Sequence, residues 1–238
     1  MKATARITIS AAILLAVAAI AASAQWNKKP YTEWSDKEAR KLLEDSPWGQ
    51  TQVVSNTSRM FNTGPGTGVS GGAPVEGSAD HLNFRIRFLS ARPIRQAFSR
   101  IIEISHKADM NDQLAAQIKA FAAGDFPDYI VIAVDVDSTE TKGQLQRAMS
   151  VLQTRTTAEL KNGTYLVGKG GQRLFLEEFQ APKKDGLGAR FIFPRMVEGK
   201  PFISEESGEI KFVSDLSGFA LNARFKVKEM MFNGKLEY

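Results

Sequence analysis

The sequence contains no cysteine, and this absence excludes several kinds of chemistry and of stabilisation. A chain without cysteine has no disulfide bond, no thiolate nucleophile and no cysteine-rich zinc site. It also lacks the cysteine that follows the signal of a bacterial lipoprotein. At 238 residues the chain is long enough to bury a core without disulfides, so we expect packing alone to stabilise it.

Histidine is almost as scarce as cysteine. His81 and His106 are the only two histidines, too few for a zinc centre when cysteine is absent. Residues 68–72 match the Gly-x-Ser-x-Gly pattern of a serine nucleophile, but they lie in a glycine-rich stretch and not at a strand-to-helix turn. We therefore predict no serine–histidine catalytic site, no bound metal and no other cofactor.

The surplus of basic residues is small. The chain has 31 lysines and arginines against 26 aspartates and glutamates, a net charge of +5. Nucleic-acid-binding domains carry a larger and clustered excess, so we predict no nucleic-acid partner. One stretch is crowded with arginines, which we interpret as the water-facing sides of a strand and a helix, with binding to anionic envelope polymers as the alternative: Arg85, Arg87, Arg92, Arg95 and Arg100.

The first 24 residues have the three parts of a secretory signal. Lys2 and Arg6 give a positive start, residues 7–22 carry no charge, and Ala22-Ser23-Ala24 matches a signal-peptidase site. The uncharged stretch is short for a membrane span of about 20 residues, and an uncleaved anchor is the alternative. We predict cleavage after Ala24 and a periplasmic or secreted bacterial protein, with no membrane span after removal of the signal.

Residues 25–61 are predicted to form a helical arm anchored by tryptophan. Ser35 and Glu38 have the spacing of a capping box, and Ser46-Pro47 is a helix stop, so we expect a short helix between them. Residues 34–48 resemble the opening module of a group of uncharacterised secreted bacterial proteins that share the pattern W-S-x-K-E-A-x-x-x-L-x-x-S-P-W. This resemblance implies no particular activity.

The aromatic residues of the arm are candidates for binding a partner. Large aromatic side chains near a chain end supply contact area at low entropic cost. We therefore take Tyr31, Trp34 and Trp48 as partner-binding candidates, with an unidentified envelope or extracellular protein as the partner. The alternative interpretation is that these rings pack the arm onto its own domain.

The rest of the chain is predicted to be a loop at 62–80, rich in glycine and proline, and an α+β domain at 82–238. Apolar patterning predicts strands at 82–88 and 129–136, and helices at 94–102, 114–122 and 145–152. This β-α-α-β-α order favours parallel pairing of the two strands. From residue 163 onward, alternation and turn residues predict a C-terminal antiparallel sheet of hairpins.

Asp135 and Asp137 form the strongest chemical motif, D-x-D-x-T, at the end of the apolar run at 129–136. It resembles the first motif of haloacid-dehalogenase-type phosphatases. The resemblance implies that Asp135 attacks phosphorus, that Asp137 handles the leaving-group proton and that Mg²⁺ bridges the site. The later acidic motif of that family has no counterpart here. The alternative is that both aspartates end the strand and help the following hydroxyl residues to cap a helix.

These observations lead to two functional hypotheses. The first is an exported, non-catalytic binding or interaction protein of the bacterial envelope, since no catalytic set is complete. The second is a metal-dependent phosphate-ester hydrolase that uses Asp135 and Asp137.

Overall fold

The computed structural model describes residues 29–56, 80–138 and 142–238. The predicted signal and nearly all of the predicted loop, residues 62–79, lie outside the described residues. Within the described ranges, no helix is both long and apolar enough to cross a membrane. Helices and antiparallel sheets make up the fold, and the predicted α+β class is confirmed.

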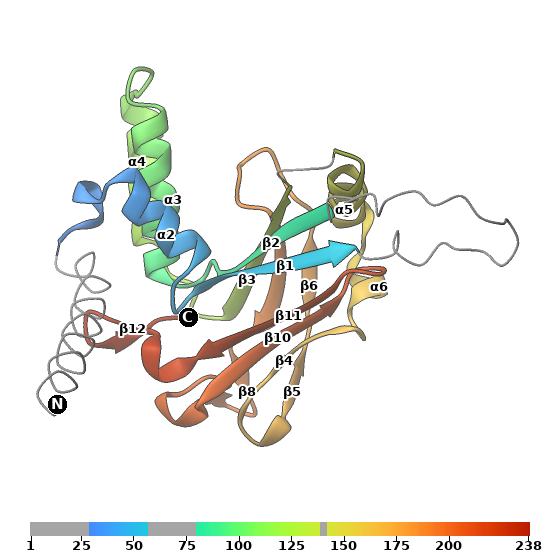
Figure 1. The fold of residues 1–238 in the computed structure, drawn as a ribbon. Coiled ribbons are helices and arrows are strands. Elements are labelled where there is room, and N and C mark those ends of the chain that lie inside the picture. Colours follow the sequence, from blue (N-terminus) through green and yellow to red (C-terminus); the bar gives the residue numbers. More distant parts are fainter. Residues whose placement is uncertain (1–28, 57–79, 139–141) are drawn as a thin grey trace, which may run out of the picture.

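Two antiparallel sheets pack face to face, and helices cover the outer face of the larger sheet (Figure 1). The larger sheet has the order β1-β2-β3-β7-β6 and the smaller one the order β11-β10-β4-β5. The strands of the larger sheet are β1 Gly49–Asn56, β2 Asp80–Phe88, β3 Tyr129–Asp137, β7 Ala189–Pro194 and β6 Glu178–Gln180. Those of the smaller sheet are β11 Ala220–Lys226, β10 Glu209–Asp215, β4 Thr164–Val167 and β5 Arg173–Phe175.

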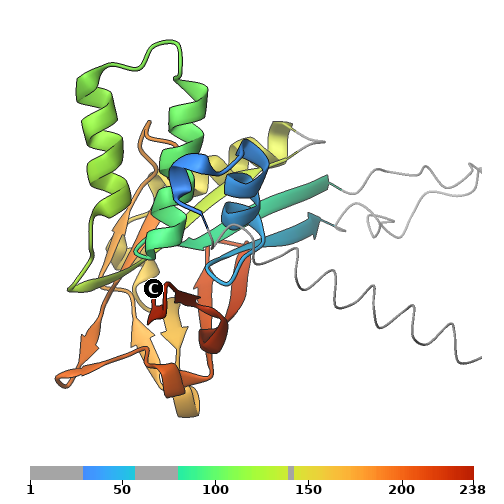
Figure 2. The ribbon, with the colours of Figure 1, turned by 90° about the vertical axis from the view of Figure 1, so that its left-hand side faces the viewer.

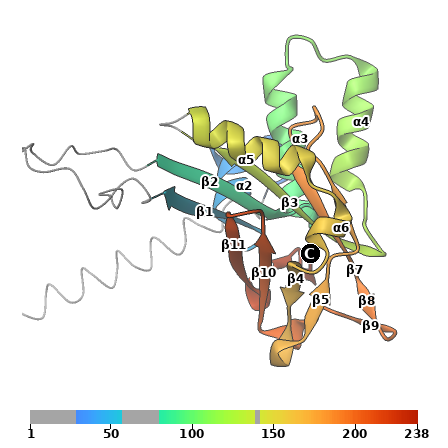
Figure 3. The same cartoon turned by 90° about the vertical axis from the view of Figure 1, so that its right-hand side faces the viewer.

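The described helices form two groups next to the larger sheet. The first described α-helix is α2 Asp36–Glu44, and the hairpin of α3 Arg92–Ser105 and α4 Asp112–Ala123 projects beside it (Figure 2). At the other end of β2 and β3 lie α5 Lys142–Thr154 and α6 Thr157–Leu160 (Figure 3). The small hairpins are β8 Met196–Val197 with β9 Lys200–Pro201, and β12 Met231–Phe232 with β13 Lys235–Leu236. Single 3-10 turns occur at Tyr31–Glu33, Lys169–Gly171, Glu205–Ser207 and Val227–Glu229.

Aromatic rings fill the space between the two sheets. Phe88 of β2 meets Phe225 of β11 edge to face, with ring centroids 4.8 Å apart. Phe191 of β7 meets Phe212 of β10 at 5.4 Å. On β3, residues 130–134 are buried on both faces, as the continuous apolar run predicted. The core therefore lies between the sheets, and β3 is its central strand.

The predicted parallel pairing of the first two domain strands is wrong. β2 and β3 are antiparallel, with Phe88 opposite Ile132 and Asn83 opposite Asp137. One helix between two strands carries the chain back along the sheet, but α3 and α4 form a hairpin that returns it to the end where β2 stopped (Figure 2). β3 then has to run back alongside β2 in the opposite direction.

The predicted C-terminal sheet is divided between the two sheets. β4, β5, β10 and β11 form the smaller sheet, but β6 and β7 add to the larger one beside β3. All of these pairings are antiparallel, and the turn at Asn233-Gly234 joins β12 to β13 as predicted. Alternation along a strand indicates a buried face but does not say which of two sheets the strand joins.

The described part of the predicted arm belongs to the same domain as residues 82–238. Its helix α2 has the predicted capping box between Ser35 and Glu38. It continues into β1, which pairs along its length with β2. The predicted boundary between arm and domain is therefore corrected, because β1 is an edge strand of the main sheet.

Two glutamines of β1 also join the larger sheet to the smaller one. The side chain of Gln52 donates to Ala220 O at 2.8 Å and accepts from Asn222 N at 2.7 Å. Gln50 makes the same pair of bonds to the backbone of Arg224. These backbone groups lie on the edge of β11, so the glutamines cover part of an edge that would otherwise be open to another strand.

Candidate functional site

The two described tryptophans of the arm are buried within their own domain. Trp34 is 1% exposed and Trp48 is 0% exposed. The indole Nε1 of Trp48 donates to Glu237 O at 2.7 Å, and its ring meets Phe232 edge to face. Tyr31 is half-buried against Trp34 at a centroid distance of 6.4 Å. The structure therefore corrects the partner-binding assignment of Trp34 and Trp48, which pack the arm onto its domain as in the alternative interpretation.

Asp135 and Asp137 lie on the helix-covered face of the larger sheet, opposite polar residues of β2. The register places Arg85 opposite Asp135 and Asn83 opposite Asp137. Because side chains of a strand alternate between faces, Arg87 lies on this same face, while Phe84, Ile86 and Phe88 face the smaller sheet. Cross-strand neighbours on one face are close enough to pair, and here they carry opposite charges.

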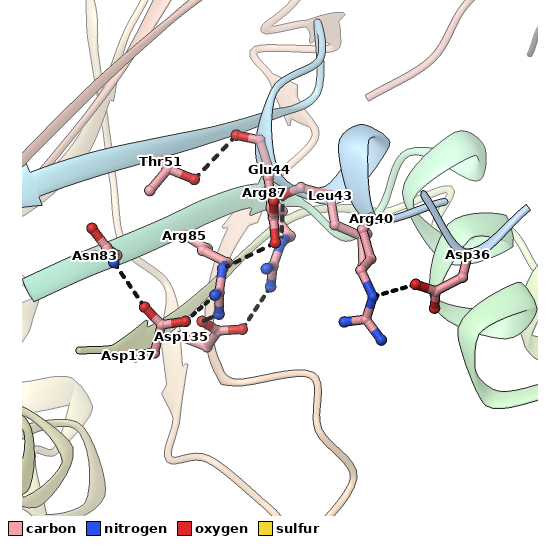
Figure 4. A network of polar contacts seen from close by, with 10 residues as sticks. All are labelled: Asp36, Arg40, Leu43, Glu44, Thr51, Asn83, Arg85, Arg87, Asp135 and Asp137. Carbon is pink, nitrogen blue, oxygen red and sulfur yellow. Dashed lines mark hydrogen bonds and ion pairs between the residues drawn. The ribbon is translucent and has the colours of Figure 1, made fainter. Parts of the chain in front are cut away.

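These residues form a charge ladder, which we define as Asn83, Arg85, Arg87, Asp135 and Asp137 (Figure 4). Asp135 accepts from Arg87 Nη1 at 2.8 Å and from Arg85 Nη1 at 3.2 Å, one bond to each carboxylate oxygen. Asp137 accepts from Arg85 and, at 3.0 Å, from Asn83 Nδ2. Each carboxylate is thus held by two donors from β2.

Helix α2 closes one end of the charge ladder. The carbonyl oxygen of Leu43 accepts from Arg87 Nε at 2.7 Å, so the last turn of α2 fixes this guanidinium (Figure 4). The carboxylate of Glu44 lies 3.7 Å from Arg85 Nε. Arg87 is only 2% exposed, and burial lowers the pKa of its guanidinium, while the charge of Asp135 acts in the opposite direction.

The geometry does not fit the first motif of a haloacid-dehalogenase-type phosphatase. In that arrangement the carboxylates stand at the carboxyl end of a parallel strand, whereas β3 is antiparallel to both β2 and β7. Both oxygens of Asp135 already accept from arginine, which leaves the carboxylate poorly placed to attack phosphorus or to hold Mg²⁺. Among the described residues, no group of three or more His, Asp or Glu side chains could hold a metal ion.

A cavity of about 250 Å³ lies beside the charge ladder. It is bounded by the C-terminal half of α2, the middle of α3, the helix-covered face of β2 and β3, and the loop between β6 and β7. One wall is charged and the other is apolar. The lining residues are Arg40, Leu43, Glu44, Arg85, Arg87, Phe98, Ile101, Ile102, Asp135, Asp185 and Gly186.

The loop between β6 and β7 reaches the cavity because of one glycine. Gly188 has φ +85°, and a Cβ at this position would lie 2.5 Å from the carbonyl oxygen of Val134. Only glycine allows the loop to lie this close to β3 in this conformation. Asp185, which lines the cavity, is ion-paired with Arg190 and accepts from Leu187 N at 3.1 Å.

Sequence reasoning missed the burial of two arginines. Arg87 and Arg95, expected on water-facing sides, are 2% and 1% exposed. Arg95 donates to the carbonyl oxygens of Ser90 and Gly124, and burial lowers the pKa of its guanidinium to about 10. The ion pairing of Arg87, but not its burial, had a signal in the sequence, because Arg85 and Arg87 alternate along one predicted strand as Asp135 and Asp137 do along another. Matching alternations of opposite charge indicate that the two strands are neighbours.

Comparisons with known proteins give no information on this site. No protein-family model, no curated protein and no solved structure matches this chain.

Proposed function

We propose that this chain is an exported, non-catalytic binding protein of the bacterial envelope, and that its ligand site is the cavity beside the charge ladder. The proposal rests on the lining of this cavity, which is charged on one side and apolar on the other. Arginine and carboxylate groups, of which Arg87 is buried, line one side, and Phe98, Ile101 and Ile102 line the other. Concave sites with apolar walls and a few convergent polar groups are the usual form of small-molecule sites. The predicted signal at residues 1–24 supports export.

The chemistry of the charged wall favours binding over catalysis. A general base or nucleophile needs a carboxylate that is free to reach the reacting atom. Asp135 and Asp137 are instead fixed by donors from Arg85, Arg87 and Asn83. A polar wall that is already oriented by its own hydrogen bonds can recognise a ligand without reorganising.

A thermal-shift screen tests this proposal. The purified chain is heated with separate classes of small envelope compounds: amino acids, short peptides, sugars, fatty acids and nucleotides. A ligand at 100 times its Kd adds about 2.7 kcal/mol of stability. At roughly 2–4 °C per kcal/mol, this corresponds to a rise in Tm of about 5–10 °C for a domain of this size. Failure of every class to raise the Tm would reject the cavity as a ligand site.

Variants locate the binding site. Ile102→Trp places a larger side chain in the lining of the cavity and is expected to abolish the shift. Ile104→Trp is the matched control, because Ile104 lies on the same helix, is also half-buried and does not line the cavity. A shift that survives Ile102→Trp would place the ligand elsewhere.

The hydrolase hypothesis has its own assay. A generic phosphate ester with Mg²⁺ is incubated with the wild-type chain and with Asp135→Asn, and we expect no turnover from either. Turnover by the wild type that is lost in Asp135→Asn would replace the binding proposal with the hydrolase.

A further inference from the structure

The cavity has three properties that together select a ligand class: donors without partners, a weakly held carboxylate, and an apolar wall. Each comes from a different part of the fold. The donors belong to α2 and β2, the carboxylate to the end of α2, and the apolar wall mainly to α3.

Two arginines of the cavity keep unused donors. Arg40 bonds to Asp36 through Nε at 2.7 Å, and Arg87 uses Nε and Nη1 for Leu43 O and Asp135. In the part of the chain that the structure describes, both terminal nitrogens of Arg40 and the Nη2 of Arg87 have no hydrogen-bond partner. Arg87 is 2% exposed, so its remaining donor has little access to bulk water, whereas the side chain of Arg40 is 54% exposed. A ligand carboxylate would supply the missing acceptors.

Glu44 is the carboxylate of the lining that is least committed to the protein. Its one described ion pair, to Arg85 Nε, is long at 3.7 Å, and its side chain is 47% exposed. Asp135 and Asp185, by contrast, each make a shorter bond to arginine. Glu44 also stands one helical turn from Arg40 on α2, so a positive group at Glu44 and a negative group at Arg40 would be close together.

The charge balance of the lining favours a ligand that carries both signs. Arg40, Arg85 and Arg87 are matched in number by Glu44, Asp135 and Asp185. A simple anion or a simple cation would leave an uncompensated charge in a partly desolvated site, which is costly. A zwitterion leaves the balance unchanged and can pair with both signs.

The size and the apolar wall define the rest of the ligand. A cavity of about 150 Å³ holds benzene, so about 250 Å³ accommodates on the order of ten non-hydrogen atoms. Phe98, Ile101, Ile102 and Leu43 provide contacts for an aliphatic group. Leucine, isoleucine and methionine have the required size, the apolar side chain and the adjacent charges.

We infer that the cavity binds a free α-amino acid with a medium-sized aliphatic side chain. The ligand carboxylate bonds to Arg40 and Arg87, the ammonium group to Glu44, and the side chain packs on Phe98 and the isoleucines of α3. This inference rests on the proposed binding function and specifies its ligand.

Titration calorimetry of the full chain with L-leucine and three analogues tests the inference. 4-Methylpentanoate lacks the ammonium group, isoamylamine lacks the carboxylate, and glycine lacks the side chain. Each analogue is expected to bind at least tenfold more weakly than leucine, because one of the three contacts is missing. Equal binding of leucine and 4-methylpentanoate, or of leucine and isoamylamine, would overturn the assignment of a zwitterion.

Single variants assign the two charged contacts. Glu44→Gln and Arg40→Gln are each expected to weaken leucine binding about tenfold or more. Glu33→Gln and Lys41→Gln are matched controls, since both residues are exposed, lie near α2 and do not line the cavity. Unchanged affinity in both test variants, with normal melting, would overturn the binding mode.

The failure of this inference can be distinguished from the failure of the proposed function. A flat leucine titration, together with a thermal shift from another compound class that is lost in Ile102→Trp, would overturn the amino-acid assignment and leave the binding function in place. No binding by leucine and no shift from any class would reject both.

Discussion

Replacement of Trp48 by alanine tests whether the N-terminal arm is part of the folding unit. Trp48 is 0% exposed, its indole donates to Glu237 O at 2.7 Å, and its backbone carbonyl accepts from Phe88 N at 2.8 Å. The ring contacts Phe232 of β12, which is distant in the sequence. Trp48→Ala removes the ring and its donor but keeps the backbone contact.

The expected loss of stability follows from these contacts. Truncation of a buried tryptophan to alanine costs about 3–5 kcal/mol. The lost indole hydrogen bond accounts for roughly 1 kcal/mol of this cost, and the cavity and lost apolar contact account for the rest. Domains are typically stable by only about 5–15 kcal/mol, so the variant would lose a large part of its stability. Trp48→Phe, which keeps most of the ring, is expected to cost less than Trp48→Ala.

Urea unfolding followed by far-ultraviolet circular dichroism measures this loss without relying on tryptophan fluorescence. With an m-value near 3 kcal/mol/M, a loss of 3–5 kcal/mol lowers the midpoint by about 1–1.7 M. Met149→Ala is the control, because Met149 is 44% exposed and its truncation is expected to change stability by less than about 0.5 kcal/mol. A Trp48→Ala midpoint equal to that of the control would refute the integrated arm and restore a docking role for its aromatic residues.

Three further variants probe the loop, the sheet edge and the helix cap. Gly188→Ala is expected to lower the Tm more than the control Gly170→Ala, since both have positive φ but only position 188 has backbone within 3 Å of a new Cβ. Equal effects would remove the steric argument. Gln50→Leu combined with Gln52→Leu is expected to cost about 1–3 kcal/mol and to speed hydrogen exchange at the edge of β11, and unchanged exchange would contradict the bridging role. Glu38 has its pKa lowered to about 2 from an ordinary 4.5, first by its bond from lysine and then by the capping serine. The contribution of ionised Glu38 to stability is therefore complete above the unfolded-state pKa near 4.5 and is lost as the pH falls toward 2. The stability advantage of wild type over Glu38→Gln should shrink between pH 5 and pH 2. A difference that stays constant over this range would contradict the lowered pKa.

The elements that could be predicted from sequence are those set by local chemistry. The capping box of Ser35 and Glu38 uses residues three apart, and the hairpin turn at Asn233-Gly234 uses adjacent ones. Both depend on backbone conformations that a few residues determine. The central position of β3 also followed from its composition, because a continuous apolar run has to be covered on both faces.

The direction of strand pairing and the burial of charged residues could not be predicted, because they depend on distant segments. The direction of β3 relative to β2 is determined by the fact that α3 and α4 fold back as a hairpin. The burial of Arg87 depends on the end of α2 lying over β2, where the carbonyl oxygen of Leu43 accepts from the guanidinium. Alternation along β2 predicted which side chains share a face, but not that a helix covers this face.

The cavity was beyond sequence reasoning for the same reason. Its lining comes from α2, α3, two neighbouring strands and the loop that Gly188 allows close to β3. The aspartates of the D-x-D-x-T motif lie beside this cavity. Asp135 lies in the cavity wall, where it orients arginines and is not positioned to attack a substrate.

The charge ladder is costly in folding free energy compared with apolar side chains at the same positions. Apolar side chains can often replace a buried ion pair without loss of stability, or with a gain of about 1–4 kcal/mol. The opposite face of β2 carries the buried apolar residues Phe84, Ile86 and Phe88, as expected for a face that contributes to stability alone. On the helix-covered face, charged residues take the corresponding positions next to the cavity. Their hydrogen bonds hold Arg87 with one donor still available, and a pre-oriented donor of this kind is more useful for recognising a ligand than for stabilising a sheet.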